Sequence, residues 1–324
     1  MDNKLKSYNV LIVGDIMLDR YLKGKVSRIS PEAPVPILEK INIEIMPGGA
    51  ANVALNIKSL GSNPLLLSIV GDDNNGEKLI DCIAENDIST EYIMTDKTRQ
   101  TTVKTRIMSK GQHILRIDEE DVETLDENTK KQLLNTFNHI VENNDVDAVI
   151  IQDYDKGLLD DYMIQNIINT AKGKGIFISV DPKFDNFFSY KNVDLFKPNL
   201  KEVSSALNKQ IAPNKDSLDK TAKELYEKLQ YKNLFITLSS KGIYYSKGDK
   251  NSEIIPTKLR DVVDVSGAGD VVLSVATLFF ISGYNPSEVA CFANIAGGLA
   301  CGKIGVATVG KDRLIEEINK SQNS

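Results

Sequence analysis

Residues 264–270 have the composition of an anion-binding corner. They read Asp-Val-Ser-Gly-Ala-Gly-Asp and precede an apolar stretch of helix length. Gly267, Ala268 and Gly269 are small enough for backbone N–H groups to approach an anion, and the positive end of the following helix would reinforce them. Asp270 would stand in the first helical turn, where a carboxylate can accept the proton of an attacking hydroxyl. The alternative is a tight turn in which Asp270 only complements the helix dipole.

Two carboxylates follow the first predicted strand, residues 9–14. Asp15 stands directly after the strand, and Asp19 follows in the same segment. Open α/β sheets bind ligands at the carboxyl ends of their strands. Carboxylates suit a polyol because they accept hydrogen bonds from neighbouring hydroxyl groups. We therefore expect both residues to face a substrate with several hydroxyls, although Asp15 can also be only a turn residue.

Glycines stand at the start of the next predicted helix, residues 49–60. Gly48 and Gly49 permit close approach of the backbone to a ligand, and Asn52 offers both a hydrogen-bond donor and an acceptor. Alternatively, the two glycines only begin the helix.

A further motif, Lys-Pro-Asn-Leu-Lys-Glu, spans residues 197–202. Asn199 followed three residues later by Glu202 predicts a capping box at a helix start. The functional alternative has both residues orienting Mg²⁺ and its waters near nucleotide phosphates, because Mg²⁺ keeps several waters and few protein ligands.

The elements that must position these residues alternate along the chain. Short β-branched runs predict strands, and amphipathic segments of helix length lie between them. Apolar strands separated by helices are typical of a mostly parallel sheet covered on both faces, so we predict a doubly wound α/β fold in a single domain, residues 1–324. The predicted strands are 9–14, 64–70, 147–152, 175–180, 194–197 and 233–238, and the predicted helices are 49–60, 76–86, 128–143, 160–172, 215–228, 271–281 and 287–302.

Two segments break this alternation, and we call them the lid: residues 19–46 and residues 100–118. Apolar and polar residues alternate in both without an intervening helix, and residues 109–112 predict a turn. We expect antiparallel strands that leave the α/β body. Such a lid can cover a site and exclude water, or form a dimer surface. Two ordinary surface hairpins are the alternative.

Composition excludes several classes of function. The net charge is −6 and the isoelectric point about 5.2, and no long basic run is present to hold nucleic acid. No apolar run is long enough for a membrane span and no signal peptide is recognisable, which favours a cytoplasmic location without a membrane partner. Neither a disulfide framework nor a metal site is expected from three scattered cysteines and two histidines: Cys82, Cys291, Cys301, His113 and His139.

Other nucleotide-binding motifs are absent or incomplete. Residues 297–304 nearly spell a P-loop, but position 304 is Ile and therefore lacks the Mg²⁺-binding hydroxyl. The same segment is predicted to be helical. No Gly-x-Gly-x-x-Gly follows a strand, and no serine stands in a nucleophile elbow.

The motifs and their order resemble a known family. Residues 48–52 and 264–270 resemble the two signatures of ribokinase-like (PfkB) carbohydrate kinases. Residues 14–21 and 27–36 more specifically resemble the kinase module of bacterial D-glycero-β-D-manno-heptose 7-phosphate kinases. Supporting matches cover nearly the whole chain, at residues 153–157, 181–183, 197–202, 291–296 and 303–305. One mild departure is Ser266, where the family usually has Thr.

This resemblance implies Mg²⁺- and ATP-dependent phosphorylation of the heptose 7-phosphate at its anomeric hydroxyl. The 1,7-bisphosphate would serve ADP-heptose and lipopolysaccharide core synthesis. By the same resemblance Asp270 is the base, and Gly267, Ala268 and Gly269 form the anion hole. Asn199 and Glu202 belong to the phosphate and Mg²⁺ region. The implied sugar-facing residues are Asp15, Asp19, Gly48, Gly49 and Asn52, and the implied adenine-pocket residues are Ser239, Lys241, Gly242 and Asn294.

The 7-phosphate of such a substrate needs cations. The lid supplies Arg106 and Arg116 as candidates, with Lys104 and Arg20 behind them. Any one of these residues can instead be a solvated surface charge.

Several expectations concern assembly and alternatives. We expect a homodimer through the lid strands. The chain has no His-x-Gly-His nucleotidyltransferase motif, so we expect a separate enzyme to make the nucleotide sugar. A kinase for another sugar would keep Asp270 without needing the 27–36 match. A sugar or nucleotide sensor would have a damaged Asp or glycine motif, and a scaffold acting through the lid is the remaining alternative.

Overall fold

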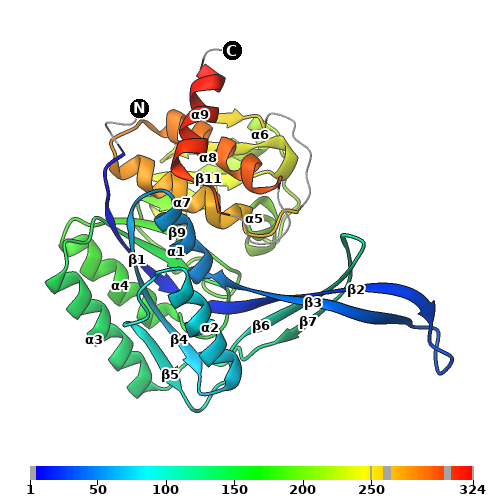
Figure 1. Cartoon of the computed structure of the whole chain (residues 1–324). Helices are drawn as coiled ribbons and strands as arrows, with labels where there is room; N and C mark the ends of the chain where they lie inside the picture. Colours follow the sequence, from blue (N-terminus) through cyan, green and yellow to red (C-terminus); the bar gives the residue numbers. More distant parts are fainter. Residues whose placement is uncertain (1–4, 249, 258–263, 303–307, 323–324) are drawn as a thin grey trace.

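A large, mostly parallel sheet forms the centre of the molecule (Figure 1). The computed structural model describes residues 5–248, 250–257, 264–302 and 308–322. The strand order is β13-β12-β11-β10-β9-β8-β1-β4-β5, in which β12 and β13 run antiparallel to their neighbours and the other pairs are parallel. The strands are β1 (Asn9–Gly14), β4 (Asn63–Gly71), β5 (Ile93–Asp96), β8 (Ala148–Gln152), β9 (Phe177–Asp181), β10 (Leu195–Phe196), β11 (Asn233–Thr237), β12 (Ile243–Lys247) and β13 (Lys250–Ile255).

Helices cover both faces of this sheet. One apolar core lies beneath α1, α2, α7, α8 and α9, and the other beneath α3, α4, α5 and α6. The helices are α1 (Ala50–Ser59), α2 (Asn74–Glu85), α3 (Glu127–Asn143), α4 (Asp161–Gly173), α5 (Leu200–Ala206), α6 (Lys215–Leu229), α7 (Ala268–Ile281), α8 (Pro286–Ala300) and α9 (Lys311–Gln322), with a 3₁₀ turn η1 (Ser239–Lys241). The predicted doubly wound α/β fold is confirmed.

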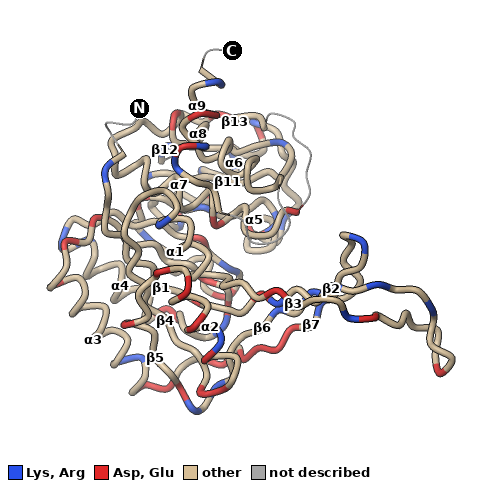
Figure 2. Tube along the Cα trace, in the orientation of Figure 1, with Lys and Arg blue, Asp and Glu red and all other residues tan. Residues whose placement is uncertain are grey.

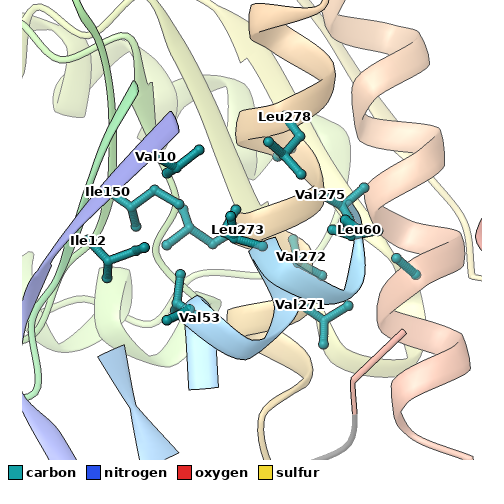
Figure 3. Packing of buried hydrophobic residues seen from close by; sticks show 14 of the residues in the cluster. Val10, Ile12, Val53, Leu60, Ile150, Val271, Val272, Leu273, Val275 and Leu278 are labelled. Carbon is teal, nitrogen blue, oxygen red and sulfur yellow. The ribbon is translucent and has the colours of Figure 1, made fainter. Parts of the chain in front are cut away.

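Strand β1 shows why two cores form. Successive side chains of a strand point to opposite faces, so Val10 and Ile12 enter one core while Leu11 and Val13 enter the other. Figure 3 shows Val10 and Ile12 on the side of α1 and α7, close to Val53. Full burial of one such side chain contributes about 1.5–3 kcal/mol. This packing fixes the starts of α1 and α7 over the carboxyl end of β1.

The lid is a separate four-stranded sheet that extends from the body (Figure 1). Its order is β3-β2-β6-β7, with bounds β2 (Ile16–Ile29), β3 (Pro36–Gly49), β6 (Val103–Ser109) and β7 (Gln112–Glu119). The pairs β2–β3 and β6–β7 are antiparallel, as expected, and β2–β6 is parallel. The two predicted hairpins therefore join edge to edge into one sheet.

The lid has one aliphatic face and one polar face. Its register aligns Ile43, Leu22, Ile107 and Leu115 across all four strands. On the opposite face it aligns Asp19 with Lys104 and Asp118, and Tyr21 with Arg106 and Arg116. Acidic and basic residues both occur along the lid strands (Figure 2). The polar face carries the lid residues that contact the body near the end of β1.

Two further sequence expectations can be compared with the fold. Residues 297–300 lie within α8, so this part of the near-P-loop is helical as predicted, while residues 303–305 lie outside the described residues. Among the helices described, none combines the length and apolar character needed to cross a membrane.

Candidate active site

The site begins where the strand order reverses. From β1 the chain proceeds to β4 and β5 on one side, and later to β8, β9, β10 and β11 on the other. Open α/β sheets bind ligands in the crevice at such a switch point. Gly14 at the end of β1 pairs with Gln152 at the end of β8, so Asp15 and Asp153 follow side by side. The strands therefore place polar residues from distant segments at one edge.

Asp270 lies in the first turn of α7, is 4% exposed and accepts three side-chain hydrogen bonds. Asn52 Nδ2 donates to Oδ2 over 2.6 Å, and Tyr154 Oη donates to Oδ1 over 3.0 Å. Gln152 Nε2 donates to Oδ1 over 3.3 Å. Burial, reinforced by the charge of Asp181, raises the pKa of Asp270 to about 6, while the bonds from Asn52 and Tyr154 oppose the rise. A carboxylate with this pKa is suited to accept a proton near neutral pH.

The turn before α7 presents backbone N–H groups beside Asp270. Gly267 caps the helix with φ of 75°, a left-handed conformation that glycine adopts without strain. The first N–H groups of a helix have no intrahelical acceptor, although the Ala268 N–H donates to the Val265 carbonyl over 3.3 Å. The N–H groups of Gly267 and Gly269 are therefore better placed than that of Ala268 to receive an anion.

A buried ion pair stands next to this turn. Lys197 Nζ lies 3.0 Å from Asp181 Oδ2, and an added Cβ at Gly269 would lie 3.6 Å from the same ammonium. Gln152 Nε2 also reaches Asp181 Oδ2 over 3.3 Å, so one amide links this pair to Asp270. Although burial opposes its ionisation, Lys197 and Lys183 hold the pKa of Asp181 below its ordinary value. A cation is thus fixed beside the anion-binding turn.

The segment at Asn199 forms the predicted capping box. Glu202 N donates to Asn199 Oδ1 over 2.9 Å, and Asn199 N donates to Glu202 Oε2 over 2.7 Å. Lys183 Nζ pairs with the other oxygen, Glu202 Oε1, over 2.5 Å. Asn199 and Glu202 therefore cap α5 as predicted. The same geometry also permits a role near Mg²⁺, because each oxygen of the Glu202 carboxylate has a further lone pair.

These carboxylates fit Mg²⁺ through water better than by direct ligation. No group of three or more His, Cys, Asp or Glu side chains suited to a metal occurs in the described part of the chain. Glu202 and Asp181 each keep acceptor capacity beside basic residues that suit phosphate. Mg²⁺ commonly keeps several waters and uses substrate phosphates as ligands.

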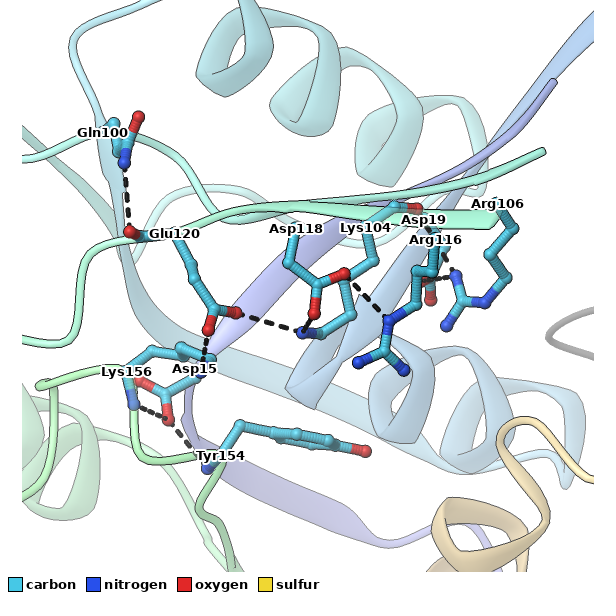
Figure 4. Close-up of polar contacts among 10 residues, drawn as sticks. All are labelled: Asp15, Asp19, Gln100, Lys104, Arg106, Arg116, Asp118, Glu120, Tyr154 and Lys156. Atoms are coloured by element: carbon cyan, nitrogen blue, oxygen red, sulfur yellow. Dashed lines mark hydrogen bonds and ion pairs between the residues drawn. The ribbon is translucent and has the colours of Figure 1, made fainter. Parts of the chain in front are cut away.

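Asp15, which the sequence predicted to face the sugar, is buried directly after β1. Its Oδ2 accepts hydrogen bonds from the backbone N–H groups of Tyr154 over 2.8 Å and Lys156 over 3.3 Å (Figure 4). Burial, together with the nearby Asp153, raises the pKa of Asp15 to about 7. Tyr154 therefore contacts Asp15 through its backbone and Asp270 through its hydroxyl, so one residue connects the two carboxylates.

The two glycines have a structural reason for being there. An added Cβ at Gly48 would lie 2.2 Å from Asp19 Oδ2, and one at Gly49 would lie 2.3 Å from the Asp15 carbonyl oxygen. Gly49 also has a φ of 63°. Both glycines thus let β3 pass close to the Asp19 carboxylate and to the Asp15 backbone at the point where α1 begins.

Both candidate lid arginines already have carboxylate partners. Arg106 forms an ion pair with Asp19 and stacks over the Tyr21 ring at 5.2 Å. Arg116 Nε lies 2.9 Å from Asp118 Oδ1, and its side chain is 59% exposed. Figure 4 shows the two arginines at the outer end of the polar cluster.

A cavity of about 690 Å³ lies against the turn before α7. Ser239, Gly242 and Asn294 line it, together with Asn199 and Gly269. Lys241 is exposed and is not among the lining residues. The Asn294 side chain accepts from Thr257 Oγ1 over 2.8 Å and donates to the Pro256 carbonyl over 3.0 Å, so it also anchors the segment after β13. The size is ordinary for a small-molecule site.

Sequence reasoning assigned no role to several residues that complete the site. They are Gln152, Tyr154, Asp181, Lys183 and Lys197. A signal was present, because these residues lie at or just after the ends of predicted strands. The order of those strands in the sheet, which brings them together, was not visible in the sequence.

Comparisons with known proteins show the family and the fold of the chain. A family model described as pfkB family carbohydrate kinase matches residues 7–312. "Bifunctional protein HldE" of Hyphomonas neptunium is 38% identical over 306 residues, which cover 94% of this chain and 62% of that protein. The protein of the same name from Helicobacter pylori is 37% identical over 313 residues, covering 96% and 66%. The chain thus spans less than two thirds of the length of these relatives.

Solved structures show the same fold. Phosphofructokinase-2 from Escherichia coli matches with a TM-score of 0.80 and 20% identity, over 98% of this chain and all of that one. Arabidopsis thaliana ribokinase matches with a TM-score of 0.73 and 15% identity, over 97% and 99% of the two chains. The fold is therefore ribokinase-like. With the family match over most of its length, the chain is a sugar kinase that belongs to the pfkB family of carbohydrate kinases.

Proposed function

We propose that this kinase phosphorylates D-glycero-β-D-manno-heptose 7-phosphate at the anomeric hydroxyl, using ATP and giving the 1,7-bisphosphate and ADP. The observation that carries the reaction type is Asp270, a buried carboxylate with a raised pKa beside the N-terminal turn of α7. The choice of sugar is supported by residues 14–21 and 27–36, which resemble the heptose 7-phosphate kinases. Such a bisphosphate would serve ADP-heptose and lipopolysaccharide core synthesis.

In the proposed mechanism, Asp270 accepts the proton of the anomeric hydroxyl while that oxygen attacks the γ-phosphorus of ATP in line. Asn52, Tyr154 and Gln152 hold the carboxylate in one orientation. The N–H groups of the 267–269 turn and the Lys197 ammonium stabilise charge on the transferred phosphoryl oxygens. One such preorganised donor contributes about 3–4 kcal/mol to the transition state.

The nucleotide would lie in the large cavity with its phosphates directed at this turn. Ser239, Gly242 and Asn294 would surround the adenine, and Asn199 and Glu202 the phosphates. Mg²⁺, held through water by Glu202, would neutralise charge on the phosphate oxygens. Asp15 and Asp19 would accept hydrogen bonds from sugar hydroxyls at the lid side, where Gly48 and Gly49 allow close approach.

The test is ADP release with Mg-ATP across a panel of acceptors: both anomers of the heptose 7-phosphate, heptose, fructose 6-phosphate, ribose and adenosine. Selective turnover of the heptose 7-phosphate supports the proposal. Turnover of another member would keep the role of Asp270 and reject the heptose, whereas silence across the panel would favour a sensor.

We also propose a homodimer through the aliphatic face of the lid. Of the eleven exposed large hydrophobic residues in the described part of the chain, seven belong to the lid: Ile29, Val35, Ile41, Ile43, Ile114, Leu115 and Ile117. The register places Ile43 and Leu115 on the aliphatic face, and exposed apolar surface of this kind is a feature of interaction sites. Sedimentation equilibrium of the wild type and of Ile43→Glu tests this, since a dimer through this face would dissociate in the variant.

A further inference from the structure

Three cationic side chains lie near one another on the lid side of Asp15. They are Arg99, Lys104 and Lys156, contributed by the segment before β6, by β6 itself and by the loop after β8. The Arg99 guanidinium hydrogen-bonds to the Lys156 carbonyl, and its charge acts on Asp15. The side chains of Lys104 and Lys156 are only 14% and 13% exposed.

One carboxylate, that of Glu120, is shared by both lysines, and Lys104 also pairs with Asp118 Oδ2 over 3.3 Å. Lys104 Nζ lies 3.1 Å from Glu120 Oε2, and Lys156 Nζ lies 3.0 Å from Glu120 Oε1 (Figure 4). Each oxygen of Glu120 thus serves a different lysine. Such a carboxylate occupies the position in which an anionic group of a ligand would be held.

The cluster also has unused hydrogen-bonding capacity. Nη1 of Arg99 is buried and has no hydrogen-bond partner among the described residues. A buried donor without a partner costs about 1–3 kcal/mol, so a further acceptor is expected there. The carboxylates of Glu120 and Asp118 pair with the two lysines, and neither provides an acceptor for this Arg99 donor.

From these contacts we infer that Arg99, Lys104 and Lys156 form the subsite for the phosphate group that the sugar already carries, and that Glu120 occupies this subsite as an internal anion until substrate displaces it. A phosphate monoester carries a charge of about −1.5 to −2 and three acceptor oxygens, against one charge on a carboxylate. It can therefore replace Glu120 on the lysines and also accept from Arg99.

The location agrees with a sugar phosphorylated far from its reacting hydroxyl. Tyr154 donates its hydroxyl to Asp270, while its backbone and that of Lys156 bind Asp15. The short segment 154–156 thus contacts Asp270 at Tyr154 and carries the Lys156 side chain two residues later, and its backbone holds Asp15. Glu120 can leave without unfolding the lid, because its backbone carbonyl stays held by Gln100 Nε2 over 3.0 Å and its side chain is 27% exposed.

This inference differs from the assignment to Arg106 and Arg116. Those arginines form ion pairs with Asp19 and Asp118 on the polar face of the lid. It rests on the proposed function only in requiring a phosphorylated substrate, so binding of inorganic phosphate tests it without any assumption about the sugar.

The first experiment measures inorganic phosphate binding to the full chain by isothermal titration calorimetry. Glu120→Gln should bind phosphate about tenfold more tightly than wild type, since a charge-assisted competitor has been removed. Adding Lys104→Gln, Lys156→Gln or Arg99→Gln to that variant should abolish the gain. The matched control is Glu127→Gln, which removes the partner of a poorly exposed lysine, Lys130, on α3 and should bind as wild type does. Equal binding by Glu120→Gln and wild type, or a gain that survives every second substitution, overturns the inference.

The second experiment uses turnover. Lys156→Gln should raise KM for the phosphorylated sugar by about tenfold or more while KM for the unphosphorylated sugar changes little, because only the former uses the subsite. If Lys156→Gln turns over the heptose 7-phosphate with an unchanged KM, the subsite is rejected while the proposed function stands. Tight phosphate binding with a different phosphorylated sugar as substrate would reject the heptose and keep the subsite.

Discussion

The side-chain amide of Asn52 donates a 2.6 Å hydrogen bond to Oδ2 of Asp270, joining two residues that lie 218 positions apart. Both side chains are buried and both stand at helix starts, on α1 and α7. An amide that donates to a carboxylate stabilises its ionised form, so Asn52 helps to keep the base charged although it is buried. Asn52 therefore contacts the proposed base directly, and the expectation from the sequence that Asn52 faces the sugar stays a prediction.

Asp270→Asn should abolish most turnover without unfolding the protein. The substitution preserves shape and removes the proton acceptor, so kcat should fall by about 10²–10⁴. Because the ionised carboxylate is disfavoured by burial, the melting temperature should stay equal or rise. Kinetics and thermal melts check both parts, and near-normal turnover in a folded variant would remove Asp270 from its role.

Tyr154→Phe should move the acid limb of the pH–rate profile. Asp270 must be ionised to accept a proton, so kcat falls as pH drops through its pKa of about 6. The Tyr154 hydroxyl lowers that pKa, so its loss should shift the limb to higher pH. Tyr244→Phe is the control, since it removes a phenol hydrogen-bonded to Asp219 instead. An unshifted limb for Tyr154→Phe would contradict the proposed role of the hydroxyl.

Lys197→Met should destabilise the protein strongly. Lys197 and Asp181 are 2% and 4% exposed and form a 3.0 Å ion pair. Removing one partner of a buried pair leaves the other charge uncompensated and costs about 3–5 kcal/mol in the free energy of unfolding. The double variant Lys197→Met with Asp181→Asn should recover a large part of that loss in denaturant titrations. Equal stability of the single variant and wild type would show that the pair contributes nothing.

Asp15→Asn should change how stability depends on pH. The pKa of Asp15 is about 7 in the folded protein against an ordinary value of 3.8. Between these values the folded state binds more protons than the unfolded state, so Asp15 makes stability fall as pH rises through this window. Thermal melts from about pH 4 to pH 8 should therefore show a smaller fall for Asp15→Asn. The exposed Asp72 serves as control, and Asp72→Asn should follow wild type.

Gly49→Ala should be far more damaging than Gly111→Ala. Both glycines have positive φ, 63° and 78°, so an alanine at either costs about 1–2 kcal/mol of backbone strain. Only at Gly49 would the new Cβ also meet backbone, 2.3 Å from the Asp15 carbonyl oxygen, whereas at Gly111 nothing lies within 4 Å. Denaturant titrations compare the free energies of unfolding. Equal losses in the free energy of unfolding for the two variants would show that the close approach of β3 to the Asp15 backbone is not tightly constrained.

The sequence predicted the fold and the local parts of the site well, for physical reasons. Apolar runs placed the parallel strands of the sheet except β5, and missed the antiparallel β12 and β13. The 264–270 segment is a continuous motif, so Asp270 and its turn could be located together. The capping role of Asn199 was likewise predictable, because a capping box lies within four residues.

The rest depended on contacts between distant segments. Arg106 pairs with a carboxylate 87 residues away, so its charge was visible in the sequence but its neutralisation by Asp19 was not. Tyr154 and Lys197 reach the site only because β8 and β10 lie in a particular order in the sheet. The lid pairing β2–β6 is parallel and joins two separate hairpins, which no local alternation of residues can reveal.

Very short connections join the lid strands β2 and β3 to the body. Between β1 and β2 stands one residue, Asp15, and β3 passes directly into α1 at Gly49. A force applied at the lid tip would turn Asp15 and the start of α1, which carries Asn52, in the same movement. Binding of a molecule to the lid would therefore act on Asp15 and on Asn52, the hydrogen-bond donor to Asp270, at the same time.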